Sequence, residues 1–115
     1  MSSNPDCLFC KIVAGEIPSE RLYEDDEILV FRDINPQAPF HGLLIPKIHL
    51  ATLNDLRPEH AKMAGRLFLV AKSLAEEQDL SAYRVVVNTN AEAGQTVFHV
   101  HMHLLAGRPM RLGLG

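Results

Sequence analysis

Three histidines alternate near the end of the chain, in the run His99-Val100-His101-Met102-His103-Leu104-Leu105. Alternation is the periodicity of a β-strand, so we expect the three imidazoles to share one face of a strand. Val100, Met102 and Leu104 should then face the opposite side, into a core. Imidazole titrates near neutral pH and serves as nucleophile, proton carrier and metal ligand. This run is therefore the first candidate for chemistry.

Three interpretations of this stripe are open. The first is a polar, solvent-facing stripe on an antiparallel strand. The second is a three-histidine zinc site, but the Cα atoms of His99 and His103 would lie roughly 13 Å apart. Metal–nitrogen bonds are only about 2 Å long, so two neighbouring rings share an ion more easily than all three. The third is a row of imidazoles along an extended anionic substrate, with a nucleophile or base at its centre and phosphate-binding groups beside it.

Gly94-Gln95-Thr96 precede this strand and fit the third interpretation. They supply flexible backbone and a hydroxyl, and backbone N–H groups in such a turn can bind phosphate. An ordinary turn glycine is the alternative for Gly94.

A second chemical motif is the pair Cys7 and Cys10, which has the spacing of a metal knuckle. Two free thiols are the alternative. A redox pair is disfavoured because no thioredoxin-like βαβ pattern surrounds the pair. A structural zinc needs four ligands, so the pair alone does not define a site.

The hydrophobic pattern predicts the elements that must position these groups. We expect a short helix over 8–14, a hairpin of strands at 21–25 and 28–34, a loop at 35–39, strands at 42–46 and 83–89, and a helix from 58 to about 78. The apolar face of the long helix is predicted to hold Ala61, Ala64, Leu67, Phe68, Ala71, Leu74 and Ala75. Short connections favour an antiparallel sheet of about five strands with helices on one face, so the expected class is α+β.

Composition restricts the function classes. A chain of 115 residues with 47% hydrophobic content is expected to form a single domain over 1–115. The net charge of −3 and the lack of a basic stripe argue against a nucleic-acid partner, so phosphate chemistry should concern a small nucleotide. No apolar run is long enough for a membrane span, and no secretory signal is visible, so a cytoplasmic location is expected.

The histidine run resembles the signature of the histidine triad family, which is His, apolar, His, apolar, His, apolar, apolar, at all seven positions. The surrounding sequence is similar to the nucleoside phosphoramidase (Hint) branch of that family over roughly residues 7 to 108. The matching segments are 9–12, 15–18, 31–39, 41–49, 86–88 and 94–98. The resemblance implies the fold of that family.

The resemblance also implies an activity, the hydrolysis of purine nucleoside 5′-phosphoramidates. His101 would be the nucleophile that forms a covalent nucleotidyl-histidine, and His99 would orient it. His103 and Asn88 would bind α-phosphate oxygens. Thr96 stands where the branch commonly has serine, and its hydroxyl would donate to the leaving group.

Other site residues follow from the same resemblance. Asp33 would bind the ribose hydroxyls, because a carboxylate accepts two hydrogen bonds from a diol. Gly94 and Gln95 would contact the nucleotide, and His41 corresponds to a histidine that supports the triad. The apolar slot for the purine would comprise Phe9, Ile12, Ile17, Phe31, Ile34 and Leu43, for which the alternative is an ordinary core.

By the same resemblance, Cys7, Cys10, His49 and His99 would hold a structural zinc, and no cofactor would be required for catalysis. A homodimer is implied, with the long helix and the strand at 83–89 at its interface. The tail 107–115 lacks the tryptophan that several relatives carry.

Other functions are alternatives to the phosphoramidase. Within the family these are a dinucleoside polyphosphate hydrolase and a nucleotidyl transferase. Outside enzymology they are a nucleotide-binding regulatory protein and a metal-binding protein that uses the histidines directly.

Overall fold

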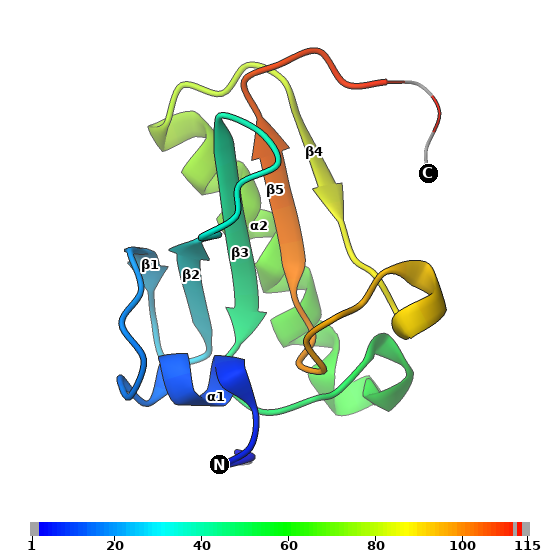
Figure 1. The fold of residues 1–115 in the computed structure, drawn as a ribbon. Helices are drawn as coiled ribbons and strands as arrows, with labels where there is room; N and C mark the ends of the chain where they lie inside the picture. The colour runs from blue at the N-terminus through cyan, green and yellow to red at the C-terminus, as the bar shows by residue number, and fades with distance from the viewer. Residues whose placement is uncertain (1–2, 112, 114–115) are drawn as a thin grey trace.

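The computed structural model describes residues 3–111 and 113. Its helices and strands are α1 (Leu8–Val13), β1 (Arg21–Glu24), β2 (Ile28–Arg32), β3 (Phe40–Pro46), α2 (Ala61–Glu77), β4 (Tyr83–Val86) and β5 (Met102–Ala106). The connections contain three short 3₁₀-helices, at Leu53–Asp55, Pro58–His60 and Ala91–Ala93. The strands form one antiparallel sheet in the order β1-β2-β3-β5-β4 (Figure 1). The predicted α+β class, the hairpin and the five strands are confirmed.

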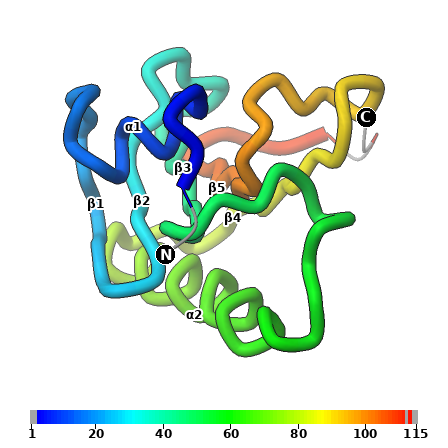
Figure 2. Tube along the Cα trace, turned by 90° about the horizontal axis from the view of Figure 1, so that it is seen from below, coloured from blue at the N-terminus to red at the C-terminus, as the bar shows by residue number. Residues whose placement is uncertain are grey.

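The sheet separates two apolar clusters, because successive strand residues point to opposite faces. On one face Ile28, Val30 and Leu44 pack with the buried side of α2. On the other face Leu29 and Ile45 pack with α1. Figure 2 shows the two helices on opposite sides of the sheet. The expectation that both helices cover one face was therefore wrong, because every residue of β3 and all of β2 except Arg32 are buried, so both sides of these strands need cover.

The long helix differs from its prediction in its buried stripe. Residues 58–60 form a 3₁₀ turn before α2 begins. The buried side chains are Met63, Leu67, Val70, Ala71, Leu74 and Ala75. Ala61 and Phe68 are exposed and Ala64 is only half-buried, which corrects their assignment to the core. Met63 and Val70 complete a spacing of three and four around Leu67, and this rotates Phe68 away from the sheet.

The histidine run is only partly a regular strand. β5 begins at Met102, so His103 lies in the strand, while His99 and His101 lie in the bent segment before it. The main-chain N–H of Val100 donates to the carbonyl of Leu50, 2.7 Å away, in place of a ladder hydrogen bond. β4 likewise ends at Val86, opposite His103, so the predicted strand at 83–89 is shorter than expected.

Within the described residues, no helix is both long and apolar enough to cross a membrane.

Candidate active site

A cavity of about 420 Å³ opens on the face of the sheet that α1 covers. All six residues predicted for the apolar slot line this cavity: Phe9, Ile12, Ile17, Phe31, Ile34 and Leu43. Five of them form its apolar wall, while Ile34 stands at the rim with 90% of its surface exposed. The predicted polar residues that line the same cavity are Asp33, His41, Thr96, His101 and His103. The fold therefore joins an apolar slot to a polar end.

His101 is held in one orientation by its own chain. Its Nδ1 atom lies 2.8 Å from the carbonyl oxygen of His99, and a carbonyl only accepts, so Nδ1 carries the proton. The Nε2 atom of the neutral ring is then a free lone pair. The ring of Phe9 packs edge-on against His101 at a centroid distance of 5.2 Å. Only 6% of His101 is exposed, so the solvent-facing stripe considered from the sequence is wrong.

A second chain of hydrogen bonds sets the tautomer of His103. The backbone N–H of Gln37 donates to Nδ1 of His41 over 3.0 Å. His41 must then carry its proton on Nε2, which lies 2.9 Å from Nδ1 of His103. Nδ1 of His103 is therefore an acceptor, and the proton of this ring sits on Nε2. The two triad histidines that line the cavity are thus opposite tautomers, one with a free lone pair on Nε2 and the other with a donor there.

Burial disfavours the charged forms of His103 and His41. It lowers the pKa of His103 to about 4, and the neighbouring His101 and His41 lower it further. Burial also lowers the pKa of His41, against the attraction of Asp33, whose carboxylate lies 3.5 Å from Nε2 of His41. At neutral pH His41 and His103 are therefore neutral hydrogen-bonding groups beside the carboxylate of Asp33.

The loop before β5 places its predicted residues differently from one another. Thr96 lines the cavity, whereas Asn88, Gly94 and Gln95 do not. Gly94 has φ +99°, and the half-buried side chain of Asn88 lies against it, 3.7 Å from where a Cβ would be. That Gln95 contacts the nucleotide stays a prediction; in the structure its side chain hydrogen-bonds within the protein.

Gln95 is 2% exposed, and its side chain hydrogen-bonds to the main chain of the loop before β5. Its Oε1 accepts the N–H of Asn90 at 2.7 Å, and its Nε2 donates to the carbonyls of Ala51 and Val97 at 2.8 and 3.0 Å. Three of the four hydrogen-bonding positions of the amide are thus used within the protein. Gln95 shapes the segment that carries Thr96.

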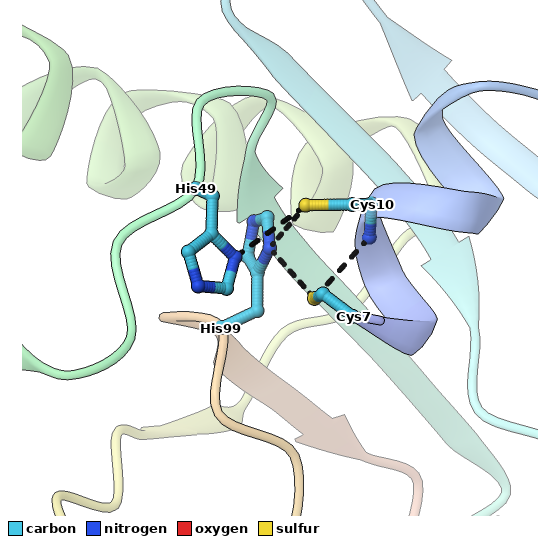
Figure 3. Close-up of side chains that lie close together, drawn as sticks. All are labelled: Cys7, Cys10, His49 and His99. Carbon is cyan, nitrogen blue, oxygen red and sulfur yellow. Dashed lines mark hydrogen bonds between the residues drawn. The ribbon is translucent and has the colours of Figure 1, made fainter. Parts of the chain in front are cut away.

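The four predicted metal ligands come together beside the cavity (Figure 3). Nδ1 of His99 lies 3.4 Å from Sγ of Cys7 and 3.6 Å from Sγ of Cys10, and Nδ1 of His49 lies 3.4 Å from Sγ of Cys10. A tetrahedral zinc with ordinary bond lengths separates its sulfur and nitrogen ligands by roughly 3.5 Å. The donor set therefore matches a tetrahedral site in both atom type and spacing.

The surroundings of this cluster prepare His99 as a ligand. Its Nε2 donates to the carbonyl of Pro46 over 2.7 Å, which leaves the Nδ1 lone pair pointing at the sulfurs. His99 is fully buried, and burial lowers its pKa to about 4. Burial also raises the pKa of the Cys10 thiol. This cluster can hold a metal such as zinc.

Several contributors to the site had no signal in the sequence. The backbone N–H of Gln37 that orients His41 and the carbonyl of Pro46 that orients His99 are main-chain groups, which no residue type reveals. Val97 lines the cavity and lies inside a segment that matched the family pattern, so that match was an available signal. Further lining residues absent from the prediction are Leu8, Pro18, Ser19, Arg32, Asn35 and Gln37.

The chain is similar to known proteins in both sequence and structure. The family model described as "HIT domain" matches residues 14–110. The purine nucleoside phosphoramidase of Escherichia coli strain K12 is 48% identical over 107 residues, which is 91% of this chain and 90% of that protein. The crystal structure of a HIT family hydrolase from Legionella pneumophila superposes with a TM-score of 0.93 at 49% identity, covering 96% of this chain and 100% of the other. A histidine triad protein from Clostridium difficile superposes with a TM-score of 0.91 at 40% identity, covering 95% and 96% of the two chains.

Proposed function

Because this chain belongs to the HIT domain family, we propose that it hydrolyses purine nucleoside 5′-phosphoramidates through a nucleotide covalently bound to His101. The observation that carries this proposal is the hydrogen bond from Nδ1 of His101 to the carbonyl of His99. It leaves Nε2 free as a nucleophile at the polar end of a cavity whose other end is apolar. The 48% identity to a purine nucleoside phosphoramidase supports the substrate class.

The reaction proceeds in two balanced steps. In the first, Nε2 of His101 attacks the α-phosphorus, the phosphorus–nitrogen bond breaks, and the departing amine takes up a proton that water supplies through the hydroxyl of Thr96. In the second, water attacks the same phosphorus, the phosphorus–Nε2 bond breaks, and a proton is released. The products are a nucleoside monophosphate and an amine. The carbonyl of His99 holds the imidazolium proton on Nδ1 in the covalent intermediate, so the positive charge formed there has an acceptor.

The neighbours of His101 stabilise the phosphate in this proposal. His103 points a donor Nε2–H at a non-bridging oxygen, because His41 occupies its other nitrogen. The hydroxyl of Thr96, on the cavity wall, donates a hydrogen bond to the leaving nitrogen. Asn88 reaches the phosphate when the nucleotide is bound, and Asp33 binds the ribose hydroxyls.

In this proposal the apolar wall of the cavity binds the purine base. Phe9 and Phe31 meet edge-to-face at a centroid distance of 5.4 Å, and Ile12, Ile17 and Leu43 stand around them. A flat purine in this slot buries both faces against apolar side chains, which is the usual way such cavities hold aromatic ligands. Ile34 at the rim covers the base from outside.

We propose that Cys7, Cys10, His49 and His99 bind a structural zinc. A bound zinc would supply a cross-link between α1, the segment after β3 and the segment before β5. His101 and His103 lie outside this donor set and stay free for catalysis. No metal is then required at the reacting phosphorus.

We further propose that residues 1–115 act as one domain that forms a homodimer. β4 is an edge strand of the sheet, and a strand edge offers unpaired main-chain groups to a second copy. Phe68 and Leu69 on α2 and Tyr83 on β4 are large apolar side chains that stand exposed in the single chain. A second copy packed on these elements would cover them.

The test is the release of amine from an adenosine 5′-phosphoramidate by the wild-type protein and by His101→Ala. We expect the substitution to abolish turnover while adenosine monophosphate still binds, since the apolar slot is intact. Binding is measured by calorimetry on both proteins. Equal turnover by the two would reject the mechanism, and turnover of a dinucleoside polyphosphate but not of the phosphoramidate would favour the polyphosphate hydrolase.

A further inference from the structure

A second cavity of about 420 Å³ adjoins the nucleotide cavity at the loop that leads into β5. Leu8, Thr96 and Val97 line both cavities and form the rim that they share. The remaining lining residues of the second cavity are Asn4, Asp6, Cys7, His49 and Phe98. Because Thr96 stands on the shared rim, a substituent on a phosphorus bound beside Thr96 can extend into this second cavity.

The walls of the second cavity are apolar on two sides. Leu8 at the start of α1 and Phe98 just before His99 are 44% and 43% exposed, and both line this cavity, so they offer apolar surface to a ligand in it. The segment that carries Phe98 is anchored on both sides. Gln95 donates to the carbonyl of Val97, and the N–H of Val100 donates to the carbonyl of Leu50. The main chain on both sides of Phe98 is therefore fixed.

The charge of this cavity selects against anions. Asp6 is the carboxylate among its lining residues, which include no lysine or arginine. Asp6 also forms no ion pair with any residue in the described part of the chain. A leaving group that carries phosphate or carboxylate would meet this negative charge, which no lysine or arginine among the lining residues offsets. An amine with an apolar body meets Leu8 and Phe98 without that cost.

We propose that the second cavity is the subsite for the leaving amine, and that it takes amines with an apolar alkyl or arylalkyl body and rejects anionic ones. The proposal rests on the proposed function and names the leaving-group side of its substrate. Phe98 supplies the apolar contact, Asp6 excludes anions, and Thr96 links the subsite to the reacting phosphorus. The same charge disfavours a dinucleoside polyphosphate, whose leaving group carries several phosphates.

Three substrates test the subsite: adenosine 5′-phosphoramidate, which releases ammonia, its N-phenethyl derivative, and the derivative formed with the amino group of phenylalanine. The phenethyl and phenylalanine substrates share one apolar body and differ by a carboxylate. For Phe98→Ala we expect the kcat/KM of the phenethyl substrate relative to that of the ammonia-releasing substrate to fall about tenfold. Phe98→Leu should restore most of this ratio, and Leu53→Ala, at an exposed leucine outside both cavities, should leave it at the wild-type value.

The charge filter is tested separately with Asp6→Asn. We expect the kcat/KM of the phenylalanine substrate relative to that of the phenethyl substrate to rise several-fold, with the difference shrinking at high salt. Unchanged ratios in Phe98→Ala and Asp6→Asn would overturn the proposal, as would an equal loss on all three substrates, which would mark Phe98 as merely structural. These outcomes leave the proposed function standing, whereas its own failure is the lack of turnover by the wild-type protein on any phosphoramidate.

Discussion

The carbonyl oxygen of His99 accepts a hydrogen bond from Nδ1 of His101 over 2.8 Å, while the imidazole of His99 faces two cysteine sulfurs. One residue thus belongs to two sites: its main chain orients the proposed nucleophile, and its side chain belongs to the proposed metal centre. The placement of His101 therefore depends on how firmly His99 is held.

The first prediction concerns the metal. His49→Ala removes one of four ligands, so we expect bound zinc to fall from one equivalent to near zero and the melting temperature to drop. His60→Ala is the matched control, because His60 lies on the 3₁₀ turn before α2 and outside the cluster. Elemental analysis and thermal melting check both variants. Full zinc occupancy in His49→Ala would contradict the assigned ligand set.

The second prediction concerns the hydrogen bonds of the Gln95 side chain. Gln95→Ala removes a buried amide that accepts from the N–H of Asn90 and donates to the carbonyls of Ala51 and Val97, and each such hydrogen bond contributes about 0.5–1.5 kcal/mol. We expect a loss of at least about 2 kcal/mol in denaturant unfolding and a fall in kcat, because Thr96 loses its support. Gln78→Ala, at an exposed glutamine after α2, should change neither quantity. A wild-type kcat in Gln95→Ala would show that the hydrogen bonds of Gln95 are not needed to position Thr96.

The third prediction is a pH dependence of stability. The pKa of His103 is lowered from its ordinary 6.5 to about 4 in the folded protein, so folding favours the neutral ring. Between these values the unfolded chain binds the extra proton, and stability therefore falls as pH drops from 6.5 toward 4. His103→Gln removes this contribution, and its stability should fall less steeply over the same range. Identical slopes in urea titrations from pH 4 to 7 would contradict the assignment.

The fourth prediction concerns assembly. The wild-type chain should sediment as a dimer at micromolar concentration, and Phe68→Glu should shift it to a monomer because a charge enters an apolar contact. Leu53→Glu places the same charge at another exposed apolar position and should remain dimeric. Analytical ultracentrifugation distinguishes the two states. A monomeric wild-type protein would rule out the proposed dimer.

The fifth prediction uses two glycines with opposite constraints. Gly65 lies inside α2 and a Cβ there meets nothing within 4 Å, so Gly65→Ala should stabilise the protein by about 1 kcal/mol. Gly107 has φ +101°, and a Cβ there would lie 2.8 Å from Cβ of Pro39. Gly107→Ala should therefore destabilise the protein by more than about 1 kcal/mol. Chemical denaturation of both variants measures the difference.

Much of the fold followed from the sequence because its signals are local. The spacing of apolar residues predicted α2, and two short strand-like runs separated by acidic residues predicted the β1–β2 hairpin. Errors arose where a partner outside the pattern decided the outcome. Val100 pairs with Leu50, which delays the start of β5, and α1 covers the face of the sheet opposite α2.

The sequence by itself determined which residues are candidates for the chemistry, because the alternating histidines and the cysteine pair are patterns of residue type and spacing. Only the tertiary structure decided what each one can do. Pro46, 53 positions from His99, turns the Nδ1 of that histidine toward the sulfurs, and the N–H of Gln37 sets the proton on His41 and thereby on His103. These partners are main-chain groups: every residue has the carbonyl and every residue except proline has the N–H, so only folding can choose among them.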